Sequence, residues 1–134
     1  MTHEDKELLL KDLCARLPYG VIIKHKDEHG RSIDTRLVGY NGDWFNYYID
    51  DLCFHLKIHE FKPYLRPMSS MTEDEKEKAK ENGCIIYLDT SPEDKGIMII
   101  ASQKGFDWLN AHHFDYRGLI EKDLAIEAPE GMYK

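Results

Sequence analysis

The residues best suited to acid–base chemistry are two adjacent histidines in the C-terminal half of the sequence. His112 and His113 are followed by Asp115, and Asp107 lies shortly before them. A histidine titrates near neutral pH, and a nearby carboxylate can orient its ring for proton transfer, as a small hydrolase would require. Adjacent residues on a helix point about 100° apart, however. A simpler interpretation therefore makes His112 a packing residue beneath Trp108 and leaves His113 partly exposed.

A second histidine pair, His55 and His59, has the spacing at which two imidazoles on one helix can bind a metal ion. Around this pair, apolar and polar residues alternate over residues 52–58, which predicts a strand. On a strand the two rings would lie about 13 Å apart, too far to share one ion. We therefore expect no metal site and no cofactor, and a melting temperature that a strong chelator leaves unchanged. A helix over residues 52–58 would contradict this interpretation.

Aromatic and arginine side chains are the main candidates for a binding surface. Several rings surround the dipeptide Asn41–Gly42, and we expect about half of them to be buried and the others to form a stacking platform. A nucleotide-type ligand would also need guanidinium groups near the rings to neutralise its phosphates. The residues predicted to contact a ligand or partner are Tyr40, Trp44, Tyr48, Arg66, His113, Tyr116 and Arg117.

The elements that must position these side chains begin with a helix. Thr2 and Asp5 have the spacing of a capping box, and leucines follow at helical intervals. Extended runs separated by short turns then replace the helical period, and Asn41–Gly42 is typical of a tight hairpin. We expect four antiparallel strands over residues 21–61, curled like a small SH3-type sheet.

The C-terminal half predicts helices around a pair of strands. Residues 62–67 contain two prolines and should form an extended connector without regular structure. Thr72 begins a charged surface helix over residues 72–82. The other expected elements are two well-buried strands at 84–88 and 97–101, a polar loop at 89–96 between them, and a C-terminal helix near 106–112.

Composition indicates a single α+β domain over residues 1–134, in which 1–66 and 67–134 could form sub-units. The chain has 134 residues, 42% of them hydrophobic, and a formal charge of −7. The longest apolar runs are far shorter than the roughly 18 residues that span a bilayer, and the first residues do not resemble a secretory signal, so we expect no membrane partner. The acidic residues of the second half disfavour binding to nucleic acid.

The three cysteines, Cys14, Cys53 and Cys84, are far apart in the sequence and stand among apolar neighbours. Their odd number and the lack of a CxxC motif argue against a disulfide framework, a zinc ribbon or a thioredoxin-type site. We expect three small buried side chains in a reducing environment, and hence a cytoplasmic protein.

Two segments are distinctive beyond their composition. Residues 62–72 read KPYLRPMSSMT, and residues 107–120 read DWLNAHHFDYRGLI, followed at 127–134 by EAPEGMYK. These segments resemble small uncharacterised proteins of phages, prophages and mobile elements of gut Bacteroidetes. The resemblance implies a genomic setting but no agreed activity, and it assigns no functional residue.

The sequence supports three hypotheses for function. The first is a non-catalytic phage or mobile-element accessory protein that binds a host protein or a nucleotide-type immune signal stoichiometrically, because recognisable catalytic motifs are lacking. The second is a small hydrolase that uses His112 or His113 with Asp115, which would have to converge in a concave pocket. The third is a structural or assembly protein, which would form a homo-oligomer through an extensive apolar interface.

Overall fold

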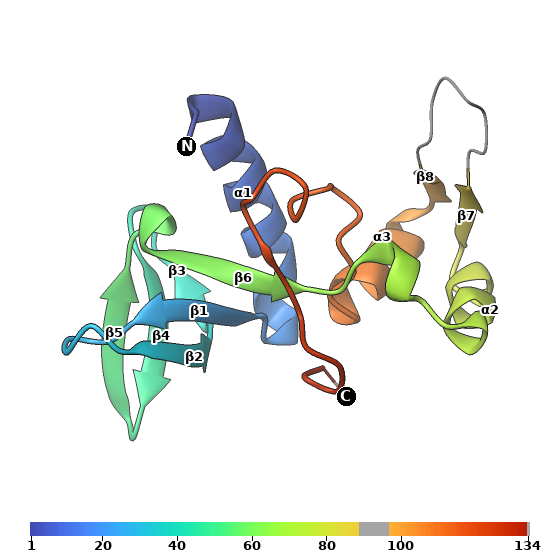
Figure 1. Ribbon diagram of the computed structural model, residues 1–134. Helices are drawn as coiled ribbons and strands as arrows, with labels where there is room; N and C mark the ends of the chain where they lie inside the picture. Colours follow the sequence, from blue (N-terminus) through green and yellow to red (C-terminus); the bar gives the residue numbers. More distant parts are fainter. Residues whose placement is uncertain (89–96, 134) are drawn as a thin grey trace.

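The computed structural model of the chain describes residues 1–88 and 97–133 and has a mixed α+β fold (Figure 1). The predicted α+β class is confirmed, and the predicted loop at 89–96 lies outside the described residues. None of the described helices is both long and apolar enough to cross a membrane. In chain order the elements are α1 (His3–Arg16), β1 (Ile22–Lys26), β2 (Ser32–Arg36), β3 (Gly39–Tyr40), β4 (Phe45–Ile49), β5 (Leu52–Leu56), β6 (Phe61–Leu65), α2 (Glu73–Glu81), β7 (Cys84–Leu88), β8 (Ile97–Ala101), α3 (Gln103–Ala111) and β9 (Ile126–Glu127).

Two sheets form the part of the molecule next to α1. The larger has the strand order β2-β1-β6-β9, in which β1 is antiparallel to both of its neighbours and β9 is parallel to β6. The smaller is the antiparallel meander β3-β4-β5. Its first turn confirms the predicted hairpin at Asn41–Gly42, because the N–H of Asn41 donates to the main-chain oxygen of Trp44 at 3.1 Å.

The structure divides the predicted four-stranded unit over residues 21–61 between these two sheets. The N–H of Leu37 donates to the oxygen of Val21 at 3.0 Å, whereas the N–H of the next residue, Val38, donates to the oxygen of Asn46 at 2.9 Å. Leu37 is buried and Val38 is exposed. One extended run thus changes sheets between β2 and β3, and alternation of residue types does not reveal such a change.

Strand β6 lies where the prolines predicted an irregular connector, so that prediction is wrong, although the extended backbone is confirmed. Pro63 pairs with Ile23 of β1, and the following residues, Tyr64 and Leu65, pair with β9. The fixed φ of proline suits an extended strand, and only its missing N–H is lost to the ladder. Pro63 therefore fits within a strand that joins the two halves of the molecule, and Pro67 lies just beyond its end.

Two clusters of buried side chains stabilise the fold. The first lies between α1 and the two sheets beside it, and α1 contributes Leu9 and Leu13 to it. Leu119 and Leu124 from the C-terminal segment belong to the same cluster. The second cluster lies among α2, α3 and β7, around Phe114. Figure 1 shows both parts, with β6 running from one toward the other.

The second part of the fold follows the predicted elements closely. The Thr72 hydroxyl and the Glu75 carboxylate form a capping box at the start of α2, as predicted. Gly105 allows α3 to approach the turn after α2, since a Cβ there would lie 2.8 Å from the oxygen of Gly83. Strands β7 and β8 form as predicted, but Ile85 and Ile100 face each other on an exposed surface. The prediction that both strands are well buried is therefore wrong for this face.

The cysteines do not share one environment. Cys84 is buried, and burial raises the pKa of its thiol. Cys14, on α1, and Cys53, on β5, are exposed. The prediction of three buried cysteines is therefore wrong for two of them, because their apolar sequence neighbours point to the other side of the helix or strand.

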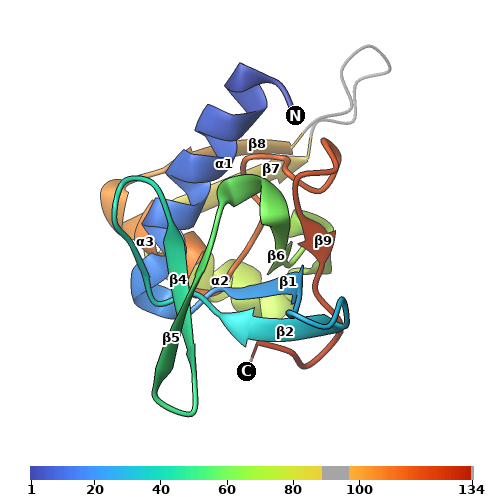
Figure 2. The same cartoon turned by 90° about the vertical axis from the view of Figure 1, so that its left-hand side faces the viewer.

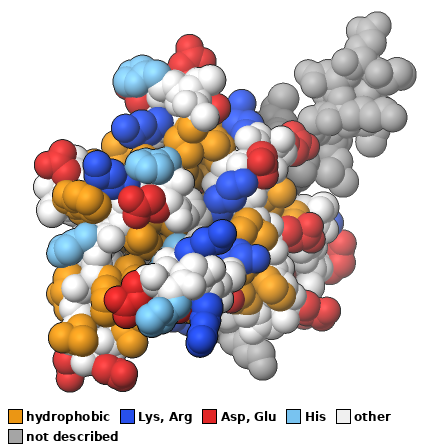
Figure 3. Space-filling view, turned by 60° about the vertical axis from the view of Figure 1, so that its left-hand side comes forward, with side chains coloured by type: hydrophobic (Ala, Val, Ile, Leu, Met, Phe, Trp, Pro, Cys, Tyr) orange, Lys and Arg blue, Asp and Glu red, His pale blue; other side chains and the backbone are white. Residues whose placement is uncertain are grey.

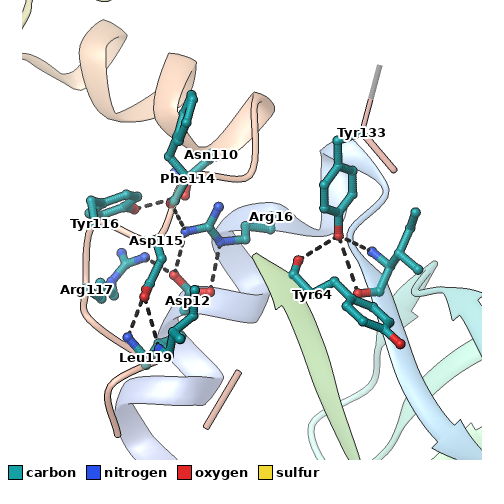
Figure 4. Close-up of polar contacts among 12 residues, drawn as sticks. Asp12, Arg16, Tyr64, Asn110, Phe114, Asp115, Tyr116, Arg117, Leu119 and Tyr133 are labelled. Carbon is teal, nitrogen blue, oxygen red and sulfur yellow. Dashed lines mark hydrogen bonds and ion pairs between the residues drawn. The ribbon is translucent and has the colours of Figure 1, made fainter. Parts of the chain in front are cut away.

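The C-terminal segment folds back across the molecule to its first strand. Beyond β9, the hydroxyl of Tyr133 donates to the main-chain oxygen of Tyr64 at 2.7 Å and accepts from the N–H of Ile22 at 2.8 Å (Figure 4). Burial raises the pKa of Tyr133 to about 12. This contact joins β1 and β6 to the end of the described chain.

Candidate functional site

A buried network of charges lies between α1 and the segment after α3 (Figure 4). The carboxylate of Asp12 accepts hydrogen bonds from Arg16 Nε at 2.8 Å and from Arg117 Nη1 at 2.7 Å. Arg16 Nη2 also donates to the main-chain oxygen of Phe114 at 2.6 Å. Asp12 and Arg16 are fully buried. These three charged side chains therefore connect two segments about a hundred residues apart in the sequence.

Two polar side chains beside this network, Asp115 and Tyr116, are held by hydrogen bonds. The two carboxylate oxygens of Asp115 accept hydrogen bonds from the N–H groups of Leu119, at 2.8 Å, and Ile120, at 3.0 Å. The hydroxyl of Tyr116 donates to Asn110 Oδ1 at 2.9 Å. These bonds fix the turn that follows α3, so Asp115 and Tyr116 act there as structural residues.

His113 lies against Tyr133, with 3.9 Å between the ring centroids. It is buried, so the prediction of a partly exposed side chain is wrong. The C-terminal segment that covers it comes from a different part of the fold, and local sequence spacing does not show this. Burial, reinforced by the positive charge of Arg16, lowers the pKa of His113 from its ordinary value of 6.5 to about 4. The imidazole is therefore neutral at physiological pH.

His112 and His113 contact different partners. His112 lies against Trp108 with 4.4 Å between ring centroids, as predicted, but the residue is exposed, so it does not pack in the interior beneath Trp108. Partial desolvation by the neighbouring side chains lowers the pKa of His112. In the described parts of the chain, no hydrogen bond links either ring to Asp115, whose oxygens are already occupied by backbone N–H groups. Neither histidine therefore forms the pair with Asp115 that the hydrolase hypothesis requires.

Arg66 and Arg117, which were predicted to face a ligand, each face a carboxylate. Arg66 makes two hydrogen bonds of 2.8 Å to Glu75 and lies 4.2 Å from the ring centroid of Phe114. Hydrogen bonding to Arg66 lowers the pKa of Glu75. Arg117 is held by Asp12 in the buried network. A phosphate would have to displace these carboxylates to reach either guanidinium group.

The seven predicted contact residues occupy two separate regions. Tyr40, Trp44 and Tyr48 belong to the meander β3-β4-β5 and its first turn. The others, Arg66, His113, Tyr116 and Arg117, lie around the central network. The structure therefore does not assemble them into one site.

The rings near the Asn41–Gly42 turn divide as predicted between core and surface. Phe45 and Tyr47 are buried, and Tyr40 is partly buried with its ring stacked on Phe45 at 4.5 Å. Trp44 and Tyr48 are exposed, with 37% and 53% of their surfaces accessible. Among these five rings, Trp44 and Tyr48 are the exposed ones.

The apolar face of the β4–β5 hairpin extends beyond the hydrophobic core. In register, Phe45 lies opposite Leu56, and Tyr47 stacks on Phe54 with 5.3 Å between centroids. The next pair on the same face joins Ile49 and Leu52, which are both exposed, Leu52 by 64%. In Figures 1 and 2 this hairpin projects below the other elements.

The tip of this hairpin combines apolar and acidic side chains. Asp50 and Asp51 form its turn, both with positive φ, and Figure 3 shows hydrophobic side chains gathered above acidic ones at the lower left. Tyr48 is one of the contact residues predicted from the sequence, whereas Ile49 and Leu52 are not. The available signal was the polar Asp50–Asp51 turn, which places its apolar neighbours at a tip.

No family model, curated protein or solved structure matches the chain. Its function therefore has to be inferred from the surfaces and cavities of the structure itself. Within residues 1–88 and 97–133, no three His, Cys, Asp or Glu side chains converge in a way that could hold a metal ion. His55 lies on β5, as its alternation predicted, and His59 lies in the short 3-10 turn that follows.

Proposed function

We propose that the chain is a non-catalytic binding protein that holds a partner protein through the β4–β5 hairpin. The observation that carries this proposal is the continuation of the apolar hairpin face past the core, through Phe54 to Ile49 and Leu52. Exposed apolar surface of this kind disfavours solubility unless something covers it, and it often marks an interaction site. Tyr48, on the opposite face of the same hairpin, adds a ring of the type enriched in binding hot spots.

The acidic surroundings of the hairpin indicate the chemistry of the partner. Asp50 and Asp51 form the tip. Burial raises the pKa of Tyr47, and the negative charges of Asp27 and Glu28 nearby raise it further. Complementary charge favours encounter and sets the orientation of a complex. We therefore propose a partner segment that carries apolar residues flanked by lysine or arginine.

The edge of the sheet suggests the conformation of that segment. β5 is the last strand in the order β3-β4-β5, and no other strand of the described chain pairs with its outer side. Antiparallel pairing uses alternate residues, so every second residue of β5 directs its N–H and C=O outward. An extended segment could add to this edge while its apolar side chains cover Leu52 and Phe54.

The genomic setting of the proposal comes from the resemblance of residues 62–72 and 107–120 to proteins of phages and mobile elements. In that setting the partner is a protein of the bacterial host. The hydrolase alternative has less support, because Asp115 is bound to the backbone and His113 is covered by Tyr133.

Affinity capture from a host lysate with four tagged proteins tests the proposal. Wild type and Ile100→Ser should retain the same partner, whereas Leu52→Ser and Phe54→Ser should lose it. Ile100 is a matched control because it is an aliphatic strand residue with 56% exposure at the other end of the molecule. The captured protein, once purified, should bind wild type at a 1:1 ratio by calorimetry.

Two outcomes would contradict the proposal. Capture that is unchanged in Leu52→Ser would show that the hairpin is not the contact surface. Sedimentation showing a dimer of the wild type that Leu52→Ser dissociates would instead favour the assembly hypothesis, with a second copy covering the hairpin.

A further inference from the structure

A cavity of about 440 Å³ lies between α1, the turn joining β3 to β4, and the segment after β5. This volume falls in the range of small-ligand sites. Its wall is part apolar and part charged, and its charged or titratable side chains come from all three segments. They are Lys6, Tyr40, Asp43, Lys57 and His59.

The lysines of this cavity are available to a ligand. Within the described residues, neither Lys6 nor Lys57 takes part in an ion pair. Asp43 is the one carboxylate among the described residues that line the cavity. The chain as a whole carries a charge of −7, so this local excess of positive charge stands out from its surroundings. An anionic group would be attracted to it more than to the rest of the surface.

An indole ring lies beside these lysines. Trp44 is 37% exposed and lines the cavity, and Lys57 Nζ lies 5.0 Å from the centroid of its ring. The remaining exposed surface of the ring can stack on a planar ligand. The same ligand could therefore contact the ring and place a negative group near the ammonium.

The backbone beneath Trp44 is already held in place. Asn41 Oδ1 accepts hydrogen bonds from the N–H of Asp43 at 3.0 Å and from that of Trp44 at 2.8 Å. The hydroxyl of Tyr40 donates to the oxygen of Gly42 at 2.7 Å. A turn fixed in this way needs little further ordering when a ligand binds, which favours affinity.

We propose that this cavity binds a small planar aromatic monophosphate, of the chemical class of the nucleoside monophosphates. The aromatic ring stacks on Trp44, and the phosphate lies between Lys6 and Lys57. Lysine binds phosphate as a point charge and does not need the fixed fork geometry of arginine. The site uses none of the arginines that the sequence suggested, and it is independent of the hairpin surface proposed for a protein partner.

Titration with AMP, followed by two-dimensional ¹⁵N NMR and by calorimetry, tests the inference. The two tryptophans give two indole N–H signals, and AMP should shift that of Trp44 while leaving that of Trp108, which packs on Phe114 and His112, in place. Adenosine and inorganic phosphate should each bind at least about tenfold more weakly than AMP, because each lacks one half of the contact.

Variants of the lysines locate the site. Lys57→Gln and Lys6→Gln should each weaken AMP binding by about five- to tenfold, since each removes one charge-assisted contact. Lys11→Gln, on the same helix but outside the cavity, should bind AMP like the wild type. The inference is overturned if AMP, GMP, CMP and UMP all fail to bind, if adenosine or phosphate alone binds as tightly, or if Lys57→Gln leaves binding unchanged.

Discussion

The central charge network and the β4–β5 hairpin use their residues in opposite ways. In the network, charged side chains lie mostly in the interior and pair with one another, as the bonds of Asp12 to Arg16 and Arg117 show. In the hairpin, apolar side chains such as Leu52 are exposed and uncovered. The charged residues that the sequence suggested for binding therefore maintain the fold, whereas apolar residues that resemble core residues in the sequence lie exposed on the hairpin.

Removing the shared carboxylate should give the largest effect on stability. In Asp12→Ala, Arg16 would remain buried and Arg117 would lose its partner, so we expect the free energy of unfolding to fall by about 3–5 kcal/mol. Urea denaturation followed by circular dichroism measures this. Glu7→Ala, at an exposed position of the same helix, should change stability by less than about 0.5 kcal/mol. A loss below about 1 kcal/mol in Asp12→Ala would show that the network is not structural.

Lowering the pH should destabilise the folded protein, because His113 is buried in its neutral form. The unfolded chain binds a proton on this residue near pH 6.5, but the folded chain does so only near pH 4. Lowering the pH through this window therefore favours the unfolded state, by about 3 kcal/mol in total. His112, whose pKa is also lowered, adds to the loss in the same direction.

The variant His113→Asn should flatten this part of the pH dependence, because asparagine tolerates the positive φ of this position and has no such proton to bind. Urea midpoints measured between pH 7 and pH 4 provide the test. An unchanged slope in the variant would mean that His113 is not the titrating group.

Substitution of Arg66, which pairs with Glu75 between β6 and α2, should have a smaller effect on the free energy of unfolding. Arg66→Lys keeps the charge but loses the two-pronged contact with Glu75, and we expect a loss of about 1–2 kcal/mol in urea denaturation. The contribution of Glu75 should disappear as the pH falls below its ordinary pKa of 4.5, because its pKa in the folded state is lower. Lys76→Ala, which breaks an exposed pair with Glu73, should leave the denaturation curve unchanged. Equal losses in the two variants would count against a special role for Arg66.

Substitutions at the hairpin tip should affect stability least. Leu52→Ser and Tyr48→Ala should change the free energy of unfolding by less than about 0.5 kcal/mol, since both side chains are exposed. Leu56→Ala, further along the same strand but buried, should cost about 2–5 kcal/mol. Thermal melts of the three variants would locate the boundary between the core and the exposed part of the hairpin. Strong destabilisation by Leu52→Ser would place the tip in the core instead.

Local patterns predicted the elements of the fold well. The capping residues Thr2 and Thr72 and the Asn41–Gly42 turn act through neighbours a few residues away, so the sequence contains the whole signal. The alternation over residues 52–58 likewise predicted β5, although Ile58 begins a 3-10 turn.

Interactions between distant segments could not be predicted in the same way. The sequence predicted Arg66 and Arg117 as ligand contacts. It could not show that tertiary packing pairs them with Glu75 and Asp12. The cover of His113 by Tyr133 and the change of sheet after Leu37 also depend on which segments pack together. The cavity beside Trp44 could not be predicted for the same reason, since Lys6, Trp44 and Lys57 come from three separate segments.

Because Tyr133 contacts β1, the end of the described chain affects when the first elements can fold. Its hydroxyl pairs with Ile22 across 111 residues of sequence, and Arg117 pairs with Asp12 across 105. Contacts of such long sequence separation close late and slow the formation of the native state. During synthesis of the chain, the N–H of Ile22 and the carboxylate of Asp12 lack these partners until Tyr133 and Arg117 have been added. We therefore expect the first strand and helix to reach their native packing only after residue 133 has been added.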